Sequence, residues 1–276
     1  MKNVMLCGDF HCGHHVGLTP PSYNHKPDED KNDPKWTLYV ARKKLWDIFA
    51  REVKARPRPD VMVANGDLID GRGERSGCTE LLTSDRDEQS EMAAAVIRSV
   101  KPKKLVMTYG TPYHTGSNGE DFESVIKKAI NVDPLGNPYK NRVDVTLKAH
   151  AYFKIGGVTF DCKHKIGASQ IPHGRATALM RENLWSSVWN EYKDVPRADV
   201  FIRSHVHYHV FCGDTKKLMM TLPALQAQGS KYGARQCSGI VDWGFVWFEC
   251  DKGEYSWEAV IPDDAVKAQK VELLEL

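Results

Sequence analysis

Short clusters of aspartate and histidine recur in this sequence, and each one follows directly after a hydrophobic segment. The first three segments are Lys2–Cys7, Val61–Ala64 and Leu105–Thr108, and each has the length and composition of a buried β-strand. Helical stretches at Lys35–Lys54 and Asp87–Val100 separate them. Strands that alternate with helices predict an α/β core with parallel pairing. Because the carboxyl ends of parallel strands meet at one edge of a sheet, the clusters are expected to converge there.

The second half of the chain is richer in strands. Val145–Ile155 and Val158–Cys162 flank Gly156-Gly157, a dipeptide suited to a two-residue hairpin turn. Arg175–Tyr192 has helical content. The remaining segments with strand character are Val200–Arg203, Tyr208–Cys212, Leu218–Leu222, Ile240–Cys250 and Glu254–Ile261.

Composition bounds the class of protein. The 276 residues show no composition shift or long linker, so one domain spanning residues 1–276 is expected. A hydrophobic fraction of 41% with 27% charged residues is ordinary for a soluble enzyme, and a net charge of +2 leaves the partner open. The seven cysteines are scattered without a C-x-x-C, which indicates neither a disulfide framework nor a thiolate zinc site. No segment reaches signal-peptide or membrane-spanning length, so we expect a cytoplasmic protein without a membrane partner.

The polar clusters carry the ligands that divalent transition metals prefer. Aspartate and histidine bind manganese, zinc and iron, and the absence of paired cysteines disfavours a structural zinc site. Any one cluster occurs often by chance, whereas their ordered combination is specific. The clusters are Gly8-Asp9-Phe10-His11, Asn65-Gly66-Asp67-Leu68-Ile69-Asp70, Gly110-Thr111-Pro112-Tyr113-His114, Cys162-Lys163-His164 and Ser204-His205-Val206-His207.

From Asp9 to His207 the clusters resemble the calcineurin-like metallophosphoesterase family, whose pattern is D-x-H, G-D-x-x-D, G-N-H-D or G-N-H-E, a lone His and G-H-x-H. The resemblance is to a phage or bacterial type of member with a variant third motif. It implies a four-layer α/β/β/α sandwich of two mixed β-sheets flanked by helices. It also implies two divalent metal ions, with manganese expected and zinc, iron or nickel as alternatives, which generate a hydroxide that attacks phosphorus in line.

The family's ligand set maps onto residues of this chain, with Asp67 as the bridge between the two metals. The third motif departs from the pattern, because Thr111 stands where the family has a ligating Asn and two extra residues precede His114. A threonine hydroxyl is a poorer ligand than an amide oxygen, so the second site is expected to be weaker, to use water or to recruit His114. The resemblance assigns Asp9, His11, Asp67 and His207 to the first metal and Asp67, Thr111, His164 and His205 to the second.

Catalytic and substrate-binding roles follow from the same resemblance. His114 is expected to protonate the leaving alcohol oxygen, and Asp70 to hydrogen-bond and orient it. In the protein Ser/Thr phosphatases an Arg directly follows the second motif. Here Gly71 takes that place and Arg72 follows, which argues against protein phosphatase specificity although Arg72 remains a candidate phosphate contact. For His14, contact with the substrate phosphate and simple solvent exposure are both open.

The expected function is that of a phosphodiesterase or nuclease acting on a diester or nucleotide-like substrate, with nucleic acid or a nucleotide as the partner. A phosphomonoesterase acting on small phosphates and a non-catalytic binding module of the same fold are the alternatives. A cysteine-based phosphatase is excluded, because neither Cys12 nor Cys78 has an Arg six residues on.

The polar loops Pro20–Pro34 and Gly71–Asp87 are interpreted as walls or a lid of the active site, with plain surface insertions as the alternative. Sequence leaves the oligomeric state open.

Overall fold

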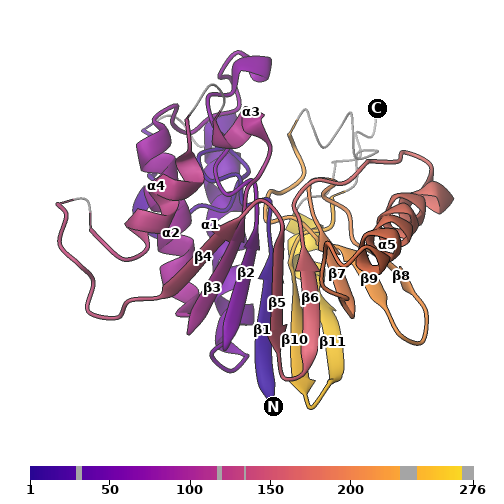
Figure 1. Cartoon of the computed structure of the whole chain (residues 1–276). Helices are drawn as coiled ribbons and strands as arrows, with labels where there is room; N and C mark the ends of the chain where they lie inside the picture. Colours follow the sequence, from indigo (N-terminus) through magenta and orange to yellow (C-terminus); the bar gives the residue numbers. More distant parts are fainter. Residues whose placement is uncertain (29–32, 117–119, 134, 231–240, 269–276) are drawn as a thin grey trace.

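Two β-sheets pack face to face between helices in the computed structural model, which describes residues 1–28, 33–116, 120–133, 135–230 and 241–268 (Figure 1). Helices α1, α2 and α4 cover the outer face of the first sheet, and α5 covers the second. The expected α/β/β/α sandwich of two mixed sheets is therefore confirmed. The α-helices of the described residues are α1 (Pro34–Lys54), α2 (Arg86–Val100), α3 (Pro112–Thr115), α4 (Phe122–Ala129), α5 (Arg175–Glu191) and α7 (Asp263–Ala268).

The first sheet has the strand order β11-β10-β1-β2-β3-β4. Strands β1 to β4 are mutually parallel, as the alternation of strands and helices predicted, and β10 and β11 add an antiparallel hairpin. The carboxyl ends of β1, β2 and β3 consequently lie at one edge, which is uppermost in Figure 1. The strands are β1 (Lys2–Cys7), β2 (Val61–Asn65), β3 (Lys104–Thr108), β4 (Asp144–Lys148), β10 (Phe245–Asp251) and β11 (Glu254–Val260).

The second sheet has the order β5-β6-β7-β9-β8. Strands β6, β7 and β9 are parallel, and β5 and β8 are antiparallel edge strands. Its parallel strands point the same way as β1 in Figure 1, so that β6 and β7 also end beside the upper edge. The strands are β5 (Ala151–Ile155), β6 (Val158–Cys162), β7 (Val200–Arg203), β8 (Val210–Gly213) and β9 (Leu218–Thr221).

Burial on both faces explains why the central strands read as continuous hydrophobic segments. In β1, Val4 and Leu6 pack into the core between the two sheets, whereas Met5 and Cys7 pack against the helices. A strand that is apolar on both faces is confined to the middle of a layered fold. The polar residues that follow it are thereby fixed at the sheet edge.

The expected strand Val145–Ile155 is wrong as a single element. The chain bends at Ala149 and His150, so that β4 joins the first sheet and β5 the second. The His150 Nε2 atom lies 2.7 Å from Asp161 Oδ1 of the neighbouring strand, which holds the start of β5 against β6. The alternating pattern continues through the bend, so periodicity gave no sign of it. The hairpin at Gly156-Gly157 is confirmed.

Two other strand starts differ from the prediction. The strand expected from Tyr208 begins at Val210, and the strand expected from Ile240 begins at Phe245, with Ile240 itself outside the described residues. Trp243 instead forms an isolated bridge with Ala224. The Tyr208 segment is still part of the turn that carries the last histidine cluster, which explains its late start.

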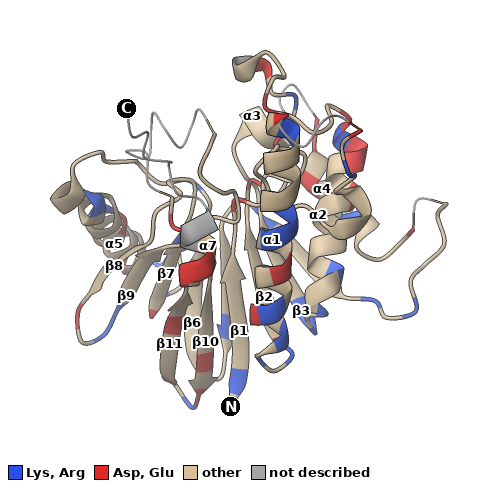
Figure 2. Ribbon diagram, turned by 180° about the vertical axis from the view of Figure 1, so that it is seen from behind, with Lys and Arg blue, Asp and Glu red and all other residues tan. Residues whose placement is uncertain are grey.

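Helix α1 shows how the surface of the first layer is built. Leu45, Ile48 and Phe49 are buried against the sheet, while basic and acidic residues alternate on the outer side (Figure 2). Arg51 pairs with a carboxylate of α7 and Arg56 with one of β11, which supports a solvated helix face. Within the described ranges, no helix combines the length and apolarity that crossing a membrane requires.

Candidate metal centre

The six most strongly predicted ligands come together at the upper edge of the two sheets. Asp9 and His11 follow β1, Asp67 follows β2, His164 follows β6, and the last two histidines follow β7. Five of the six side chains are essentially buried, and that of His205 is 21% exposed. A buried collection of two aspartates and four histidines is costly unless a cation or hydrogen bonds compensate it. The six are Asp9, His11, Asp67, His164, His205 and His207.

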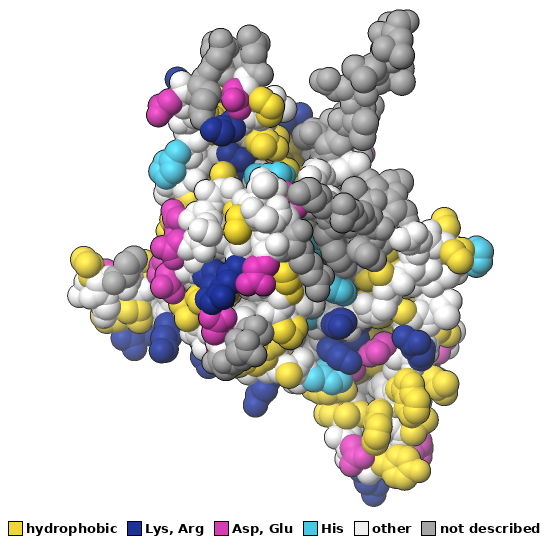
Figure 3. All heavy atoms as spheres, turned by 90° about the horizontal axis from the view of Figure 1, so that it is seen from above, with side chains coloured by type: hydrophobic (Ala, Val, Ile, Leu, Met, Phe, Trp, Pro, Cys, Tyr) yellow, Lys and Arg dark blue, Asp and Glu magenta, His cyan; other side chains and the backbone are white. Residues whose placement is uncertain are grey.

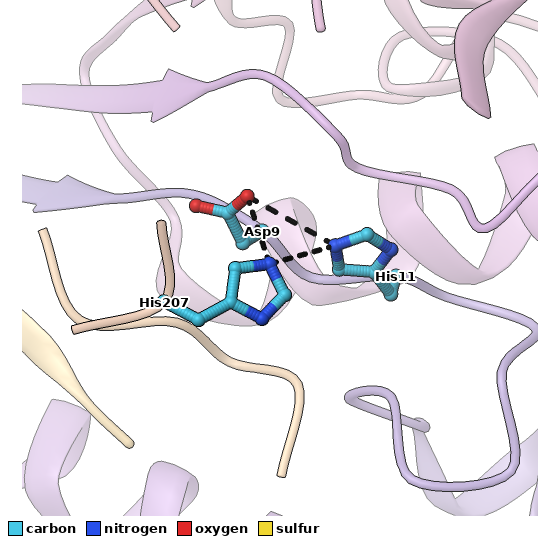
Figure 4. Close-up of side chains that lie close together, drawn as sticks. All are labelled: Asp9, His11 and His207. Atoms are coloured by element: carbon cyan, nitrogen blue, oxygen red, sulfur yellow. Dashed lines mark hydrogen bonds and ion pairs between the residues drawn. The ribbon is translucent and has the colours of Figure 1, made fainter. Parts of the chain in front are cut away.

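Asp9, His11 and His207 form a first triad (Figure 4). The His207 Nε2 atom lies 3.3 Å from Asp9 Oδ1 and 3.3 Å from His11 Nε2, and His11 Nε2 lies 3.9 Å from Asp9 Oδ1. Asp9 Oδ1 is buried and accepts no hydrogen bond from any described residue. A buried carboxylate oxygen facing two imidazole nitrogens is a donor set that fits a divalent cation.

Asp67, His164 and His205 form a second triad. The Asp67 Oδ2 atom lies 2.9 Å from His164 Nε2 and 3.9 Å from His205 Nδ1. The two triads adjoin, since His164 Nε2 is also 4.0 Å from Asp9 Oδ1. Asp67 additionally has a ligand atom within 4.8 Å of those of His11 and His114, so its carboxylate faces both triads. This is the placement that a bridging ligand requires.

Backbone strain is concentrated on the same residues. A positive φ is uncommon for a residue other than glycine and costs on the order of 1 kcal/mol, so it persists only where the surroundings enforce it. Five of the six ligand candidates adopt it, which indicates that the backbone is bent to aim their side chains inward. Their φ angles are 50° for Asp9, 45° for His11, 50° for Asp67, 75° for His205 and 55° for His207.

Two glycines make room for the second triad. A Cβ atom on Gly66, which has φ +80°, would lie 2.5 Å from His164 Nδ1. A Cβ atom on Gly110 would lie 2.2 Å from Asp67 Oδ1. Both separations are far below van der Waals contact, so only glycine permits these side chains to approach.

Hydrogen bonds behind the histidines fix which nitrogen faces the centre. The His164 Nδ1 atom lies 2.7 Å from the backbone oxygen of Asn65, which can only accept, so Nδ1 donates and Nε2 points to Asp67. His11 Nδ1 lies 3.0 Å from Asp70 Oδ1, which leaves Nε2 for the first triad. A carboxylate behind a ligating imidazole orients the ring and raises its basicity.

The structure assigns the Asp70 carboxylate a different neighbour from the one expected. Its Oδ1 atom bonds His11 and lies 3.8 Å from His114 Nδ1. His114 Nδ1 instead donates to the backbone oxygen of Asp70 at 2.6 Å. His114 lies in the short helix α3, and its ring reaches the backbone of the second motif. The expected orientation of His114 by Asp70 is thus made through the main chain.

Asp70→Asn is expected to weaken metal binding at the first triad by about 10- to 100-fold, because the amide keeps the shape but loses the charge behind His11. The affinity is measured by titrating the metal-free protein with Mn²⁺ or Zn²⁺. Asp60→Asn is the matched control, since Asp60 pairs with Lys103 near the opposite end of the strands. Unchanged affinity in Asp70→Asn would remove this role for the carboxylate.

The electrostatics of the centre favour positive charge. Burial alone would lower the pKa of His164, but Asp67 and Asp9 outweigh it and raise that pKa to about 9. Burial and the neighbouring His114 lower the pKa of His11 to about 4, so this ring is neutral at physiological pH. The pKa of Asp67 is held well below its ordinary value, against the effect of burial, by His164 and His114. The pKa of Asp9 is also lowered, against the effect of burial, by His207 and His164, so both carboxylates are ionised and favour a cation beside them.

Thr111, which stands at the position of the family's Asn ligand, is engaged with Asp67. Its backbone nitrogen donates to Asp67 Oδ1 at 2.6 Å, and its hydroxyl lies 3.1 Å from Oδ1 and 3.2 Å from Oδ2. The hydroxyl therefore reaches the second triad as a hydrogen-bond donor. Its direct ligation of a metal stays a prediction.

The two expected phosphate contacts are placed as follows. His14 is only 3% exposed, so the alternative of simple solvent exposure is wrong. Its Nδ1 atom accepts from the Val16 nitrogen at 3.1 Å, and its Nε2 atom lies 3.9 Å from Glu80. Arg72 is exposed and pairs with Glu120 at 2.7 Å, so it would have to leave this ion pair to grip a phosphate. Both substrate contacts stay predictions.

The loop that starts at Gly71 packs against the first cluster. Its Glu80 oxygen accepts from the His15 nitrogen at 2.8 Å, and its Leu82 nitrogen donates to the Gly13 oxygen at 2.7 Å. The loop therefore lies against Gly13, His14 and His15, directly after the first ligand cluster. Its role as a wall or lid stays a prediction.

Sequence reasoning missed a hydrogen-bonded hub at the end of β2. The Asn65 amide donates to Ser204 Oγ at 2.7 Å and to the Lys163 oxygen at 3.2 Å, and it accepts from Thr108 Oγ1 at 2.9 Å. One side chain thus ties together the ends of β2, β3, β6 and β7. The available signal was position, because Asn65 and Ser204 are the first residues of two of the polar clusters.

Glu123 of α4 is a second missed residue. It is 1% exposed, and its Oε1 atom accepts from the Gly110 nitrogen at 2.8 Å, on the loop that carries Thr111. Burial, reinforced by the negative Asp67, raises the pKa of Glu123 to about 7, although the bond from Gly110 opposes the shift. The Glu123 carboxyl therefore holds the Gly110 backbone in place, and the free energy of keeping it buried rises with pH as it ionises.

Glu123→Gln is expected to stabilise the metal-free protein above pH 7 by up to roughly 3 kcal/mol, because the amide accepts from Gly110 without a charge to bury. The folded-state pKa lies above the unfolded value near 4.5. The stability contributed by the proton is thus full below about pH 4.5 and is lost as the pH rises through about 7. Denaturant unfolding of both proteins at pH 5 and pH 8 checks this, and an equal difference at the two pH values would contradict it.

No family model matches this chain, and no curated protein does. Among solved structures, the chain is similar to zinc-complexed Vps29 from Entamoeba histolytica, with 14% identity over 93% of this chain and 97% of that one and a TM-score of 0.42. It is also similar to an archaeal phosphodiesterase, with 14% identity over 94% and 100% of the two chains and a TM-score of 0.42. A third is a predicted phosphoesterase from Streptococcus pneumoniae, with 11% identity, coverages of 93% and 87% and a TM-score of 0.37.

Proposed function

We propose that the chain is a dinuclear metal-dependent phosphoesterase of the calcineurin-like type. The observation that carries the proposal is the meeting of two ligand triads, with the Asp67 carboxylate facing both. Paired divalent cations in such a centre supply Lewis-acid charge to phosphate oxygens and lower the pKa of water. Manganese is the favoured metal, and zinc, iron and nickel are the alternatives.

In this mechanism the chain's own groups orient the ligands and move a proton. Asp70 and the Asn65 backbone hold the Nε2 atoms of His11 and His164 inward. His114 Nδ1 donates a hydrogen bond to the backbone oxygen of Asp70, so its Nε2 atom is the one available to carry a proton to the leaving oxygen. Thr111 hydrogen-bonds Asp67 and so keeps the shared carboxylate in one orientation.

A phosphodiester, in a nucleic acid or a nucleotide, is the favoured substrate. A monoester carries close to two negative charges at neutral pH and gains more from a dedicated arginine, whereas a diester carries one. The candidate arginine, Arg72, is bound to Glu120, which supports the diester. A phosphomonoesterase acting on small phosphates is the alternative. The cytoplasmic location remains a prediction.

The test combines metal analysis with a substrate panel. The purified chain, incubated with Mn²⁺, is expected to retain close to two ions and to hydrolyse bis-p-nitrophenyl phosphate faster than p-nitrophenyl phosphate. Single- and double-stranded DNA and cyclic nucleotides extend the panel. Metal retention without turnover of any ester would favour the non-catalytic binding module, and loss of both would overturn the proposal.

A further inference from the structure

Helix α5 covers the second sheet with only one of its sides. Leu179 on that side packs with Phe201 and Met219 in a buried cluster. The opposite side carries five large apolar residues that are between 48% and 72% exposed, and Figure 3 shows hydrophobic side chains gathered over this helix at the lower right. Single exposed apolar residues are ordinary, but a contiguous stripe marks an interaction surface. The α5 stripe consists of Met180, Leu184, Trp185, Trp189 and Tyr192.

The spacing and the chemistry of the α5 stripe are those of an interface. Met180 and Leu184 are four residues apart, as are Trp185 and Trp189, and Tyr192 follows three residues later. The five therefore form a broad band on the side of α5 away from Leu179. The rings of Trp185 and Trp189 stack with their centroids 6.4 Å apart. Aromatic residues and methionine are enriched in interface cores, and rings already held in place lose little entropy on binding.

We propose that the α5 stripe binds the same stripe of a second copy of this chain, with the two helices antiparallel about a two-fold axis near Ser186. Arg181 and Glu191 are both exposed and lie five residues before and five residues after Ser186. Among the described residues neither has an ion-pair partner. The two-fold axis brings Arg181 of one copy to the level of Glu191 of the other, twice per dimer.

Two pairs of apolar residues obey the same symmetry. Met180 and Tyr192 lie six residues on either side of Ser186, and Leu184 and Val188 lie two residues on either side. An antiparallel pair about this axis therefore sets Met180 opposite Tyr192 and Leu184 opposite Val188. Trp185 and Trp189 reach the levels of Ser187 and Asn183 of the other copy. Surface complementary to itself is what a two-fold dimer requires.

The charges of the stripe disfavour a nucleic acid. A polynucleotide is held by lysine and arginine that neutralise phosphates, and aromatic stacking adds to that attraction. Beside the stripe, α5 exposes one positive residue, Arg181, and one negative residue, Glu191, whose charges cancel, so this side of the helix offers no net positive charge to a phosphate backbone. A second copy matches it in both apolarity and charge.

The length of α5 sets the strength of the dimer. Its 17 residues span about 25 Å. A contact made by this helix alone is therefore expected to bury less than the roughly 800 Å² per partner of a standard stable interface. The dimer is therefore expected to dissociate on dilution. No residue of α5 is a candidate metal ligand, so the inference does not depend on the proposed phosphoesterase activity.

The experiment follows the mass of the full chain by sedimentation and light scattering from about 1 to 100 µM, around the affinity expected of a small interface. The wild type is expected to pass from one chain to two, and Leu184→Ser with Trp185→Ser to remain one chain throughout. The matched control replaces two exposed apolar residues elsewhere, Val40→Ser with Leu135→Ser, and is expected to dimerise as the wild type does. Circular dichroism verifies that each variant is folded.

Charge reversal tests the antiparallel arrangement. Arg181→Glu and Glu191→Arg alone are each expected to weaken the dimer by about tenfold, and the two together to restore it to within about threefold, because the attraction is re-formed with opposite signs. A wild type that stays one chain at every concentration, or a dimer unaffected by Leu184→Ser with Trp185→Ser, would overturn the proposal. So would a double reversal that fails to recover, or a labelled single-stranded oligonucleotide that binds the monomer and is lost with Trp185→Ser.

Discussion

Asp67→Asn is expected to lower kcat/KM toward a diester by roughly a thousandfold and to leave less than one tightly bound metal ion per chain. The reason is that its carboxylate faces both triads, with Oδ2 2.9 Å from His164 Nε2 and ligand atoms of His11 and His114 close by. Asparagine keeps the shape and still accepts the hydrogen bond from the Thr111 nitrogen. It removes only the shared negative charge, so the variant isolates electrostatics from packing.

The comparison with a single-triad variant makes this result specific. Asp9→Asn removes a carboxylate from the first triad alone and is expected to leave the second triad able to hold one ion. Asp60→Asn, near the opposite end of the strands, is expected to change neither metal content nor rate. Inductively coupled plasma analysis of the three dialysed proteins gives the stoichiometries. Two tightly bound ions in Asp67→Asn would show that Asp67 does not bridge.

The central strands and the convergence of their polar ends could be predicted from sequence, because both depend on local pattern. Val61–Asn65 is apolar at nearly every position, which places it inside a layered fold, and Asp67 then has to lie at its carboxyl end. The same reasoning brought His164 and His207 to one edge although they belong to the second sheet. Order along the chain and strand polarity were sufficient for these residues.

The features that sequence did not show arise from bends and from contacts distant in sequence. Nothing in the alternation of Val145–Ile155 distinguishes one long strand from two, and the break is fixed by His150 meeting Asp161. The Asp70 carboxylate bonds His11, and His114 bonds the Asp70 backbone oxygen, contacts that join residues 59 and 44 positions apart in the sequence. The Asn65 hub depends on partners as far as 139 residues away.

The contacts of the third motif are compatible with two roles for His114. Thr111 reaches Asp67 with both its backbone nitrogen and its hydroxyl, and His114 lies close enough to Asp67 and His11 to serve as acid or as ligand. Its ring packs edge-on against His11, with centroids 4.5 Å apart. The two roles predict opposite results when the imidazole is removed.

His114→Ala is expected to slow hydrolysis of a diester with a poor leaving group, such as a dinucleotide, by about 10²- to 10⁴-fold, because no acid then protonates the departing oxygen. Bis-p-nitrophenyl phosphate has a leaving group that departs without a proton, so its hydrolysis is expected to fall less than about tenfold. Metal content is expected to stay at the wild-type value, since both triads remain complete.

The control for His114→Ala is His150→Ala, which removes a partly exposed histidine bound to Asp161 and is expected to change neither substrate's rate beyond about threefold. The ratio of the two rates is the measurement, because it cancels any general loss of active protein. Equal slowing of both diesters together with a loss of bound metal would make His114 a ligand. In that case His114, and not Thr111, would take the role of the family's Asn ligand and would bind a metal together with the second triad.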